Sequence, residues 1–397
     1  MTTGLVAIIA LAIWLYLLFG RGVFWRGLER DDALIPWGEE SNKPETWPTI
    51  NAVIPARNEA DLVGRGITSL LRQTYPGRLA ITLVDDQSSD GTAEIAREAA
   101  HEAGATDLVT VLSGANTEPG WTGKIWAMQQ GVRHISELPV APDYILFTDA
   151  DISYESSDIL ERLVRGTLAR DTVLTSLMVK LRCRALTERL FVPAFVFFFA
   201  KLYPFAWVND PKERTAAAAG GCMLVRREAL EAAGGLQAIR TALIDDCALA
   251  ALLKRHGPIW LGLTERVVSL RPYNHFADFR RMVVRSAYSE LRYSRLRLAG
   301  TIVGMALTYL APPLLTLFAS GAARGLGAAA WAIMVLAYAP TLRLYGLSFL
   351  WGLVLPLVAG AYTAFTIESA VAHERGRGGA WKGRFQTEPA SGKTPGA

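Results

Sequence analysis

Hydrophobic and polar residues follow three different patterns along the chain. Residues 5–19 form an uncharged apolar run, residues 49–297 alternate short apolar runs with amphipathic stretches, and residues 298–367 are again almost entirely apolar. The alternation is typical of a mostly parallel sheet whose strands are connected by helices. Long uncharged runs are typical of membrane helices. The pattern therefore predicts an α/β domain flanked by N-terminal and C-terminal transmembrane helices.

The first apolar run predicts a membrane anchor over residues 1–22. Arg21, Arg26 and Arg30 follow this run at once, and basic residues directly after a span are typical of its cytoplasmic side. A cleaved signal peptide would instead carry its positive charge before the apolar run. We expect residues 23–48 to be a linker, because the prolines and polar residues of 41–48 interrupt any helical period.

The central region, residues 49–297, contains the elements expected of a mostly parallel sheet. Its apolar runs predict strands at 50–54, 79–84, 108–112, 144–148 and 173–177. Its amphipathic stretches predict helices at 59–73, 92–103 and 124–133. Ligands of such sheets bind beyond the carboxyl ends of the strands, so the residues that follow each run are the candidates for chemistry.

The C-terminal region, residues 298–370, contains three apolar stretches at 298–323, 325–342 and 344–367, each long enough to span a bilayer. The tail, residues 371–397, is basic over 373–384 and should prefer the cytoplasm. Three crossings from a cytoplasmic domain would leave this tail outside. Two crossings and a re-entrant segment would bring it back, and the sequence leaves both arrangements open.

Composition excludes several classes of protein. Of the 397 residues 51% are hydrophobic and 20% are charged, which excludes a disordered chain. The 41 basic residues are nearly balanced by 37 acidic ones, so we expect no nucleic-acid partner. Cys183, Cys222 and Cys247 have no metal-type or redox spacing, and their odd number argues for reduced thiols in a cytoplasmic domain.

Polar and acidic groups follow three of the expected strands, at 55–59 (PARNE), 85–92 (DDQSSDGT) and 149–151 (DAD). Carboxylates can accept hydrogen bonds from a base or ribose, and can hold a divalent cation against a pyrophosphate. In an extended chain Asp149 and Asp151 would point the same way, as one metal site requires. Each group also has a simpler interpretation: a surface D-x-D, a turn with a helix cap, or a proline that ends a strand.

These motifs, in this order, resemble those of the family 2 glycosyltransferases, which adopt the GT-A nucleotide-sugar fold. The resemblance covers residues 49–297 and includes GWTGK at 120–124 and GGCMLVRR at 220–227. Within the family the chain is most similar to the hopene-associated membrane glycosyltransferases, and its layout resembles that of ceramide glucosyltransferases. The resemblance therefore implies a transferase that uses a nucleotide sugar at a membrane.

The resemblance also implies roles for individual residues in binding the donor. Asp86 would contact the uracil and Asp149 the ribose, while Asp151 would bind the Mg²⁺ or Mn²⁺ that bridges the diphosphate. Lys124 would be a second cation for the donor or, equally well, a solvated lysine at a helix start. The remaining residues implied to line the nucleotide pocket are Pro55, Arg57 and Glu59.

The catalytic base must lie elsewhere, because a carboxylate held on a metal is poorly placed to accept a proton. Asp245 and Asp246 resemble the family's acidic pair, usually Glu-Asp, and we assign Asp246 as the base. The charge of Asp245 would raise the proton affinity of its neighbour. The pair could instead only cap the helix expected at 247–256. Direct attack by the activated hydroxyl would invert the anomeric configuration, as the family implies.

Residues 271–297 lack the Gln-x-x-Arg-Trp motif of polymer-making relatives, which favours the transfer of a single sugar.

Two further segments point to the membrane, and the first of them is again residues 271–297. Their seven arginines, interleaved with aromatic residues, suit an amphipathic segment on an anionic leaflet, although a solvated helix face or contacts to the donor phosphates are alternatives. Residues 186–208 are apolar and aromatic, so we expect an in-plane interfacial helix, an acceptor groove or buried core.

Together these features predict an inverting, metal-dependent hexosyltransferase that moves a sugar from a UDP-sugar to a hydroxyl of a membrane lipid, hopanoid or ceramide-like. The expected location is the cytoplasmic face of the inner membrane, with several membrane passes. The alternatives are a processive polysaccharide synthase and a catalytically silent scaffold that binds nucleotides. The identity of the sugar depends on a few hydrogen bonds that residue spacing does not reveal.

Overall fold

The computed structural model describes residues 2–35, 43–376, 378, 380–381 and 384–385. The chain divides into two compact units. The sheet unit comprises Leu28–Arg182 and Phe205–Pro272, and the helix unit comprises Met1–Gly27, Cys183–Pro204 and Tyr273–Ala397. The chain therefore leaves the sheet unit at 183–204, and the sheet unit ends at Pro272 and not near residue 297.

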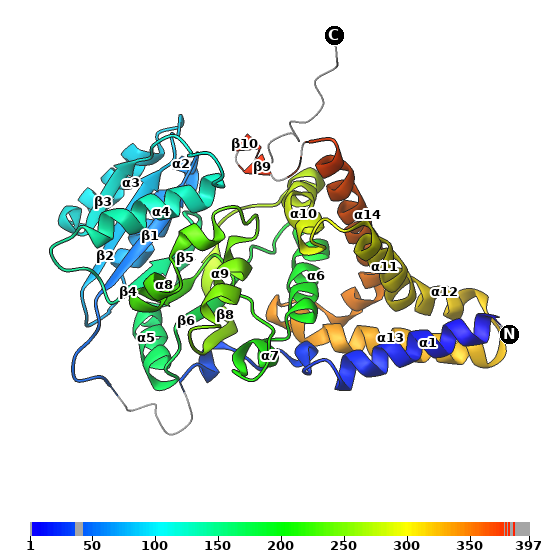
Figure 1. Cartoon of the computed structure of the whole chain (residues 1–397). Coiled ribbons are helices and arrows are strands. Elements are labelled where there is room, and N and C mark those ends of the chain that lie inside the picture. The colour runs from blue at the N-terminus through cyan, green and yellow to red at the C-terminus, as the bar shows by residue number, and fades with distance from the viewer. Residues whose placement is uncertain (1, 36–42, 377, 379, 382–383, 386–397) are drawn as a thin grey trace, which may run out of the picture. The chain divides into compact units, whose positions relative to one another are not determined.

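The sheet unit is built on a mixed sheet in which eight strands of the described chain lie in the order β3-β2-β1-β4-β7-β6-β8-β5 (Figure 1). Strands β3, β2, β1 and β4 are parallel, as are β6 and β8, whereas β7 is antiparallel to both of its neighbours. The strands are β1 (Ile50–Ala56), β2 (Leu79–Asp85), β3 (Val109–Ser113), β4 (Tyr144–Phe147), β5 (Ile152–Tyr154), β6 (Leu174–Lys180), β7 (Met223–Arg226) and β8 (Ile259–Ser269).

Helices of the sheet unit connect these strands and bury one apolar face each. For example, α2 buries Val63, Ile67 and Leu70, which recur at helical spacing. The helices are α2 (Ala60–Leu71), α3 (Thr92–Glu102), α4 (Gly123–Ser136), α5 (Ile159–Ala169), α7 (Phe205–Asn209), α8 (Arg227–Ala232) and α9 (Asp245–Leu253). The α/β fold with a mostly parallel sheet predicted from the sequence is confirmed.

Pro55 does not end the first strand, because β1 continues through it to Ala56. Beyond Val53, β1 no longer pairs with β4, while its pairing with β2 continues to Ala56. A proline is tolerated where one side of the strand needs no amide donor. Pro55 is fully buried inside the sheet.

Part of the expected linker is fixed on the sheet unit. Asp31 is buried and accepts a hydrogen bond from Thr264 Oγ1 at 2.7 Å. The carbonyl oxygen of Leu34 accepts one from Arg170 Nε, also at 2.7 Å, and the Leu34 side chain is fully buried. Residues 28–35 therefore belong to this unit, with Asp31, Leu34 and Ile35 buried, and residues 36–42 lie outside the described residues.

The helix unit contains the apolar helices. Its elements are α1 (Thr2–Phe19), η1 (Phe24–Arg26), α6 (Leu186–Leu202), α10 (Phe276–Glu290), α11 (Arg295–Met305), η5 (Ala306–Leu310), α12 (Ala311–Phe318), α13 (Gly321–Leu344), η6 (Phe349–Val354) and α14 (Leu355–Glu374). Within the described chain, three helical segments are long and apolar enough to cross a membrane: Arg295–Phe318, Gly321–Leu344 and Phe349–Glu374. The N-terminal helix α1 is shorter, with 18 residues.

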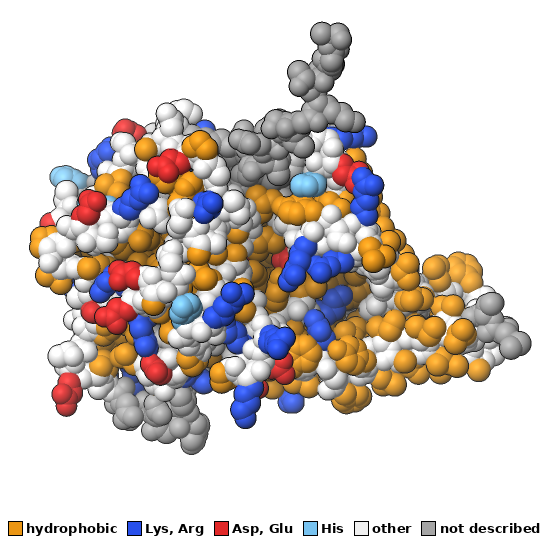
Figure 2. Space-filling view, viewed as in Figure 1, with side chains coloured by type: hydrophobic (Ala, Val, Ile, Leu, Met, Phe, Trp, Pro, Cys, Tyr) orange, Lys and Arg blue, Asp and Glu red, His pale blue; other side chains and the backbone are white. Residues whose placement is uncertain are grey.

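Hydrophobic side chains gather over the face formed by α1, α12 and α13, whereas charged side chains gather near α10 and the C-terminal end of α14 (Figure 2). Of the basic tail expected at 371–397, α14 contains the first residues and the pair β9 (Ala380–Trp381) and β10 (Arg384–Phe385) follows. Residues 386–397 lie outside the described residues.

A tryptophan of α1 satisfies a backbone carbonyl that two prolines leave without a donor. In a helix the carbonyl of Thr308 would accept from residue 312 or 313, and both are prolines without an N–H group. Trp14 Nε1 donates to this carbonyl oxygen at 2.7 Å. Such replacement of a missing helical bond by a neighbour is what allows prolines in membrane helices.

The apolar segment expected at 186–208 forms two helices, and α6 packs inside the helix unit. Phe191 of α6 contacts the rings of Phe279 of α10 and of Tyr362 and Phe365 of α14. Because α6 and α10 bury their aromatic faces against α14, residues 183–204 and 273–297 belong to this unit although they are distant in sequence.

Candidate functional site

The loops that follow β1 and β2 interlock. The backbone N–H of Asn58 donates to Ser88 Oγ at 2.9 Å, and Asn58 Oδ1 accepts from the N–H of Ser89 at 3.0 Å. Asn58 and Gln87 both have positive φ, at 50° and 56°, a left-handed conformation that asparagine tolerates better than most residues. The two strand ends are therefore held as one rigid edge.

Arg57 and Asp86 lie together at this edge. Arg57 donates to the backbone carbonyl of Asp86, and its Nη1 lies 3.6 Å from Asp86 Oδ2. Asp86 is fully buried, and burial of a carboxylate requires such a partner. The two residues expected to bind the nucleotide thus already form a neutralised pair.

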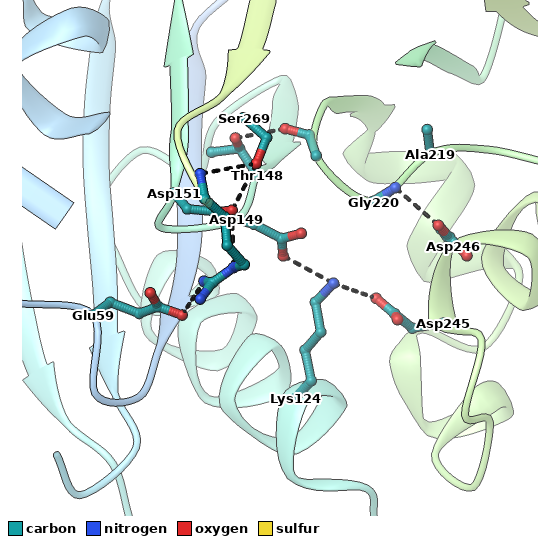
Figure 3. A network of polar contacts seen from close by, with 12 residues as sticks. Glu59, Lys124, Thr148, Asp149, Asp151, Ala219, Gly220, Asp245, Asp246 and Ser269 are labelled. Carbon is teal, nitrogen blue, oxygen red and sulfur yellow. Dashed lines mark hydrogen bonds and ion pairs between the residues drawn. The ribbon is translucent and has the colours of Figure 1, made fainter. Parts of the chain in front are cut away.

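Asp149 and Asp151 do not point the same way, so this part of the prediction is wrong. The chain turns after β4, with the N–H of Ile152 donating to the carbonyl of Asp149 at 3.2 Å, and the alternation of an extended chain is lost. As a result the two carboxylates have different partners. Asp149 faces Lys124, whereas Asp151 accepts from Ser269 Oγ at 2.8 Å (Figure 3).

Arg271 is a site residue that the sequence reasoning missed. Its Nη2 pairs with Glu59 Oε1 at 2.5 Å and its Nε with Asp151 Oδ2 at 3.1 Å. The arginine therefore ties the residue that follows β1 to the residue that follows β4. Its place among the seven arginines of 271–297 points to the membrane segment, but it lies two residues after β8, and recognition of that strand places it at the sheet edge.

Lys124 lies between two carboxylates. Its Nζ is 2.9 Å from Asp149 Oδ1 and 3.0 Å from Asp245 Oδ2 (Figure 3). Burial disfavours the charged ammonium, but the attraction of both carboxylates outweighs it and raises the pKa of Lys124 above its usual value. Lys124, in the first turn of α4, is therefore not a solvated lysine.

Asp246 has the environment of a general base. The backbone N–H of Gly220 donates to its Oδ2 at 2.9 Å, and the N–H of Cys247 donates to its Oδ1 at 2.7 Å. Burial, with the negative charge of Asp245, raises the pKa of Asp246 to about 6, and Lys124 opposes this shift. The side chain remains half-buried, so a substrate can reach it.

Asp245 and Asp246 also occupy the first turn of α9, where a helix favours negative charge. The capping interpretation and the catalytic one are therefore compatible. The bond from the N–H of Cys247 satisfies a helix-end donor and orients the carboxylate at the same time.

Gly220 is required by the closeness of these groups. A Cβ atom at this position would lie 3.2 Å from Lys124 Nζ and 3.5 Å from Asp246 Oδ2. Any side chain would therefore intrude between the ammonium and the carboxylate. Glycine also lets the backbone N–H approach Asp246 directly.

The predicted site residues thus form three groups in the sheet unit. Lys124 brings together the predicted Asp149, Asp245 and Asp246; Arg271 brings together Glu59 and Asp151; and Arg57 pairs with Asp86. Pro55 is the exception, because it is buried within β1 and presents no polar group.

The donor set suits a hard divalent cation bound together with substrate. Mg²⁺ and Mn²⁺ prefer carboxylate oxygens, and Mg²⁺ usually takes its other ligands from substrate phosphates and water. The Asp149 side chain is 35% exposed and can offer its carboxylate in this way. Among the described residues no group of three or more His, Cys, Asp and Glu side chains forms a protein-only metal site.

Comparison with known proteins identifies the family and the type of fold. The family model described as "Glycosyltransferase like family 2" matches residues 48–281, more than half of the chain. A mannosyltransferase from Pyrobaculum calidifontis, solved in complex with GDP-Man and Mn²⁺, is similar in structure with a TM-score of 0.55 and 20% identity. The match covers 93% of this chain and 99% of that one, and it supports the GT-A-type fold.

Two curated relatives are similar over a shorter stretch. The 4,4'-diaponeurosporenoate glycosyltransferase of Staphylococcus haemolyticus is 32% identical over 128 residues, which are 32% of this chain and 31% of the relative. That of Staphylococcus aureus is 34% identical over 115 residues, 29% of this chain and 27% of the relative. The chain thus matches less than a third of the length of these relatives. On the family match and the fold, the chain belongs to the glycosyltransferases of family 2.

Proposed function

We propose that this protein is an inverting glycosyltransferase that moves a sugar from a UDP-sugar to a hydroxyl group of a membrane lipid. The observation that carries the proposal is the carboxylate of Asp246. It is half-buried, is oriented by two backbone N–H groups, and has a pKa raised to about 6, close to the pH at which it must accept a proton.

In this proposal Asp246 removes the proton of the acceptor hydroxyl as the oxygen attacks the anomeric carbon. The carbon–oxygen bond to the diphosphate breaks on the opposite face, so the anomeric configuration inverts. Asp245 helps to keep the proton affinity of Asp246 high, and the Asp245–Lys124 ion pair fixes its position.

The donor would lie against the loops after β1, β2 and β4. Arg57, Glu59 and Asp86 would recognise the nucleoside, and Asp149 the ribose. Mg²⁺ or Mn²⁺ held by Asp151, with Asp149 nearby, would supply positive charge to the leaving diphosphate. Lys124 adds a fixed ammonium beside Asp149 and so reduces the repulsion of the phosphates by that carboxylate.

The apolar helices and the relatives support the acceptor class that we propose. Three helical segments of the described chain are apolar and long enough for a membrane, and the curated relatives are diaponeurosporenoate glycosyltransferases. A hopanoid or ceramide-like lipid, reached from the cytoplasmic leaflet of the inner membrane, is our specific proposal. The basic residues after α1 support a cytoplasmic catalytic domain.

The test is transfer of radiolabelled sugar from a panel of UDP-sugars into total lipid extract by the detergent-purified protein. Asp246→Asn should reduce turnover about 10²- to 10⁴-fold, as expected for loss of a general base, while UDP binding is retained. Asp107→Asn is the matched control, because Asp107 is an exposed aspartate in the turn before β3. Equal turnover by Asp246→Asn and the parent would refute the base assignment.

A second arm tests the metal. Chelation should stop transfer and Asp151→Asn should weaken the metal-dependent binding of UDP. Turnover that is insensitive to chelation would contradict the metal role. Labelled product longer than one sugar would instead indicate a polysaccharide synthase, and UDP binding without any transfer would indicate a scaffold.

A further inference from the structure

The apolar C-terminal region of the helix unit begins and ends at the same place. Arg295, at the start of α11, pairs with Glu374, at the end of α14, with Nε and Oε1 2.8 Å apart. The rings of Tyr293 and His373 stack beside them at a centroid distance of 4.2 Å. A chain that enters and leaves a bilayer at one surface crosses it an even number of times, so α11–α12, α13 and α14 cannot all be single crossings.

The segments α11–α12 and α13 are long and apolar enough to cross a membrane, and α1, which is shorter, is apolar along its whole length. Helix α1 lies beside α12 and α13 (Figure 1), and Trp14 is bonded to Thr308. The η1 turn that follows α1 lies near the C-terminal half of α13, since the ring of Phe197 contacts both Phe24 of η1 and Tyr338 of α13. These three segments therefore form one bundle.

Charge assigns the two ends of this bundle to different sides of the membrane. Basic residues cluster where α1 and α13 end and where α11 begins. At the opposite end, around the connection from α12 to α13, Arg324 is the only basic residue among the described residues. Basic residues mark the cytoplasmic side of membrane spans. The residues of the basic end are Arg21, Arg26, Arg295, Arg297 and Arg343.

Helix α14 differs from these segments because α10, a helix that carries charged residues, packs along one of its faces. Arg280 of α10 donates to Glu368 of α14 from Nε at 2.6 Å, and the N–H of Tyr288 donates to Ser369 Oγ at 3.1 Å. Helix α10 also presents the exposed Arg281 and Arg285. A helix with charges of this kind is not accommodated in the hydrocarbon core.

The other face of α14 is an exposed apolar stripe. Its residues are separated by 7, 3 and 4 positions, which places them on one side of the helix. Leu357 is 74% exposed, and Ile367 and Val371 are each 39% exposed. With Ala364 these residues define what we call the α14 stripe: Leu357, Ala364, Ile367 and Val371.

We propose that α14 lies in the plane of the cytoplasmic leaflet, with the α14 stripe in the boundary between headgroups and acyl chains, while α1, α11–α12 and α13 cross the bilayer. At about 1.5 Å per residue its 20 residues would be long enough to cross, so its contacts and not its length decide its orientation. The basic end of the chain then remains on the cytoplasmic side.

Depth measurements in lipid nanodiscs test this orientation directly. Nitroxide labels would be placed singly at Leu357, Ala364, Ile367 and Val371 of the full-length protein, with Cys183→Ser as background, since Cys222 and Cys247 are buried. Accessibility to oxygen and to a water-soluble nickel chelate should indicate one common depth for all four positions. A depth that passes through a maximum along α14 would overturn the proposal.

Exposed positions on α13 provide the matched control, because a crossing helix must show such a maximum. A second measurement uses cysteines at Ser320, Ser348 and Arg375, all exposed, and a membrane-impermeant maleimide. Ser320→Cys should be labelled in intact spheroplasts, and Ser348→Cys and Arg375→Cys only in inverted vesicles. Labelling of Ser348→Cys and Arg375→Cys from opposite sides would show that α14 crosses, and would overturn the proposal even if a spin-labelled variant failed to fold.

Discussion

Gly220 donates its backbone N–H to Asp246 Oδ2 over 2.9 Å, so the loop before β7 and the first turn of α9 hold one carboxylate between them. The carboxylate is fixed by main-chain groups that no side-chain rotation can remove. In the proposed mechanism this arrangement would hold the base in one orientation toward the acceptor hydroxyl. It also makes the site sensitive to any atom added at position 220.

Gly220→Ala should lower kcat about tenfold or more, because misplacement of a catalytic group by a fraction of an ångström is costly. The new Cβ would lie 3.2 Å from Lys124 Nζ and push the ammonium or the carboxylate aside. Steady-state kinetics with purified protein measures this loss. Gly300→Ala is the control, since a Cβ at that position has nothing within 4 Å. Unchanged kcat in Gly220→Ala would show that the close contact has no part in catalysis.

The rate should depend on pH through Asp246. Its raised pKa of about 6 means that the carboxylate is protonated, and inactive as a base, below that pH. We therefore expect kcat/KM to rise with pH through about 6 and then to level off. A pH–rate profile with donor at low concentration measures this limb. If the residual activity of Asp246→Asn rose with pH in the same way, the titrating group would be a residue other than Asp246.

Lys124→Gln should shift the rise of kcat/KM to higher pH. The ammonium of Lys124 opposes the upward shift of the Asp246 pKa, so its loss lets the pKa rise further. The variant should also be less stable, because Asp149 and Asp245 lose their shared partner. Lys212→Gln, at an exposed lysine, should change neither property. A rise of kcat/KM that shifted to lower pH in Lys124→Gln would contradict the electrostatic role of Lys124.

The bond from Trp14 to Thr308 predicts an interaction between distant positions. Trp14→Phe should lower the free energy of unfolding by about 1 kcal/mol, because a buried carbonyl loses its donor. Pro312→Ala would restore an N–H group four residues after Thr308 and should reduce the effect of Trp14→Phe. Thermal unfolding of the two single variants and the double variant in detergent measures this coupling. Additive effects would show that the prolines are irrelevant to the tryptophan bond.

Much of the fold could be predicted because its apolar runs are long and regular. The five expected strands match β1, β2, β3, β4 and β6 to within two residues at each end, apart from the β6 end, which extends to Lys180. The short strands β5 and β7 were missed because three or four residues carry too little periodicity. Strand β8 was missed although it is long, and with it the position of Arg271.

Local sequence could not reveal two features of the site. The turn after Asp149 depends on a backbone bond to Ile152, which separates the two carboxylates that an extended chain would align. The pairing of Arg271 with Glu59 joins residues 212 positions apart, and no local pattern encodes such a distance. Lys124 was recognised as a candidate, but its bridge between Asp149 and Asp245 depends on the packing of α4 and α9.

The interruption of the sheet unit by α6 also constrains the order in which the protein can be completed during synthesis. The hydroxyl of Tyr362 donates to the carbonyl of Phe191 at 2.9 Å, so α6 makes this last contact only when 171 further residues have been made. Other aromatic partners of α6 come earlier in the chain, with Phe24 of η1 before it and Phe279 of α10 and Tyr338 of α13 after it, and β7 and β8 join β6 within the same interval. A chain released before α14 would lack the contacts of Phe191 with Tyr362 and Phe365, so the last helix completes the packing around α6.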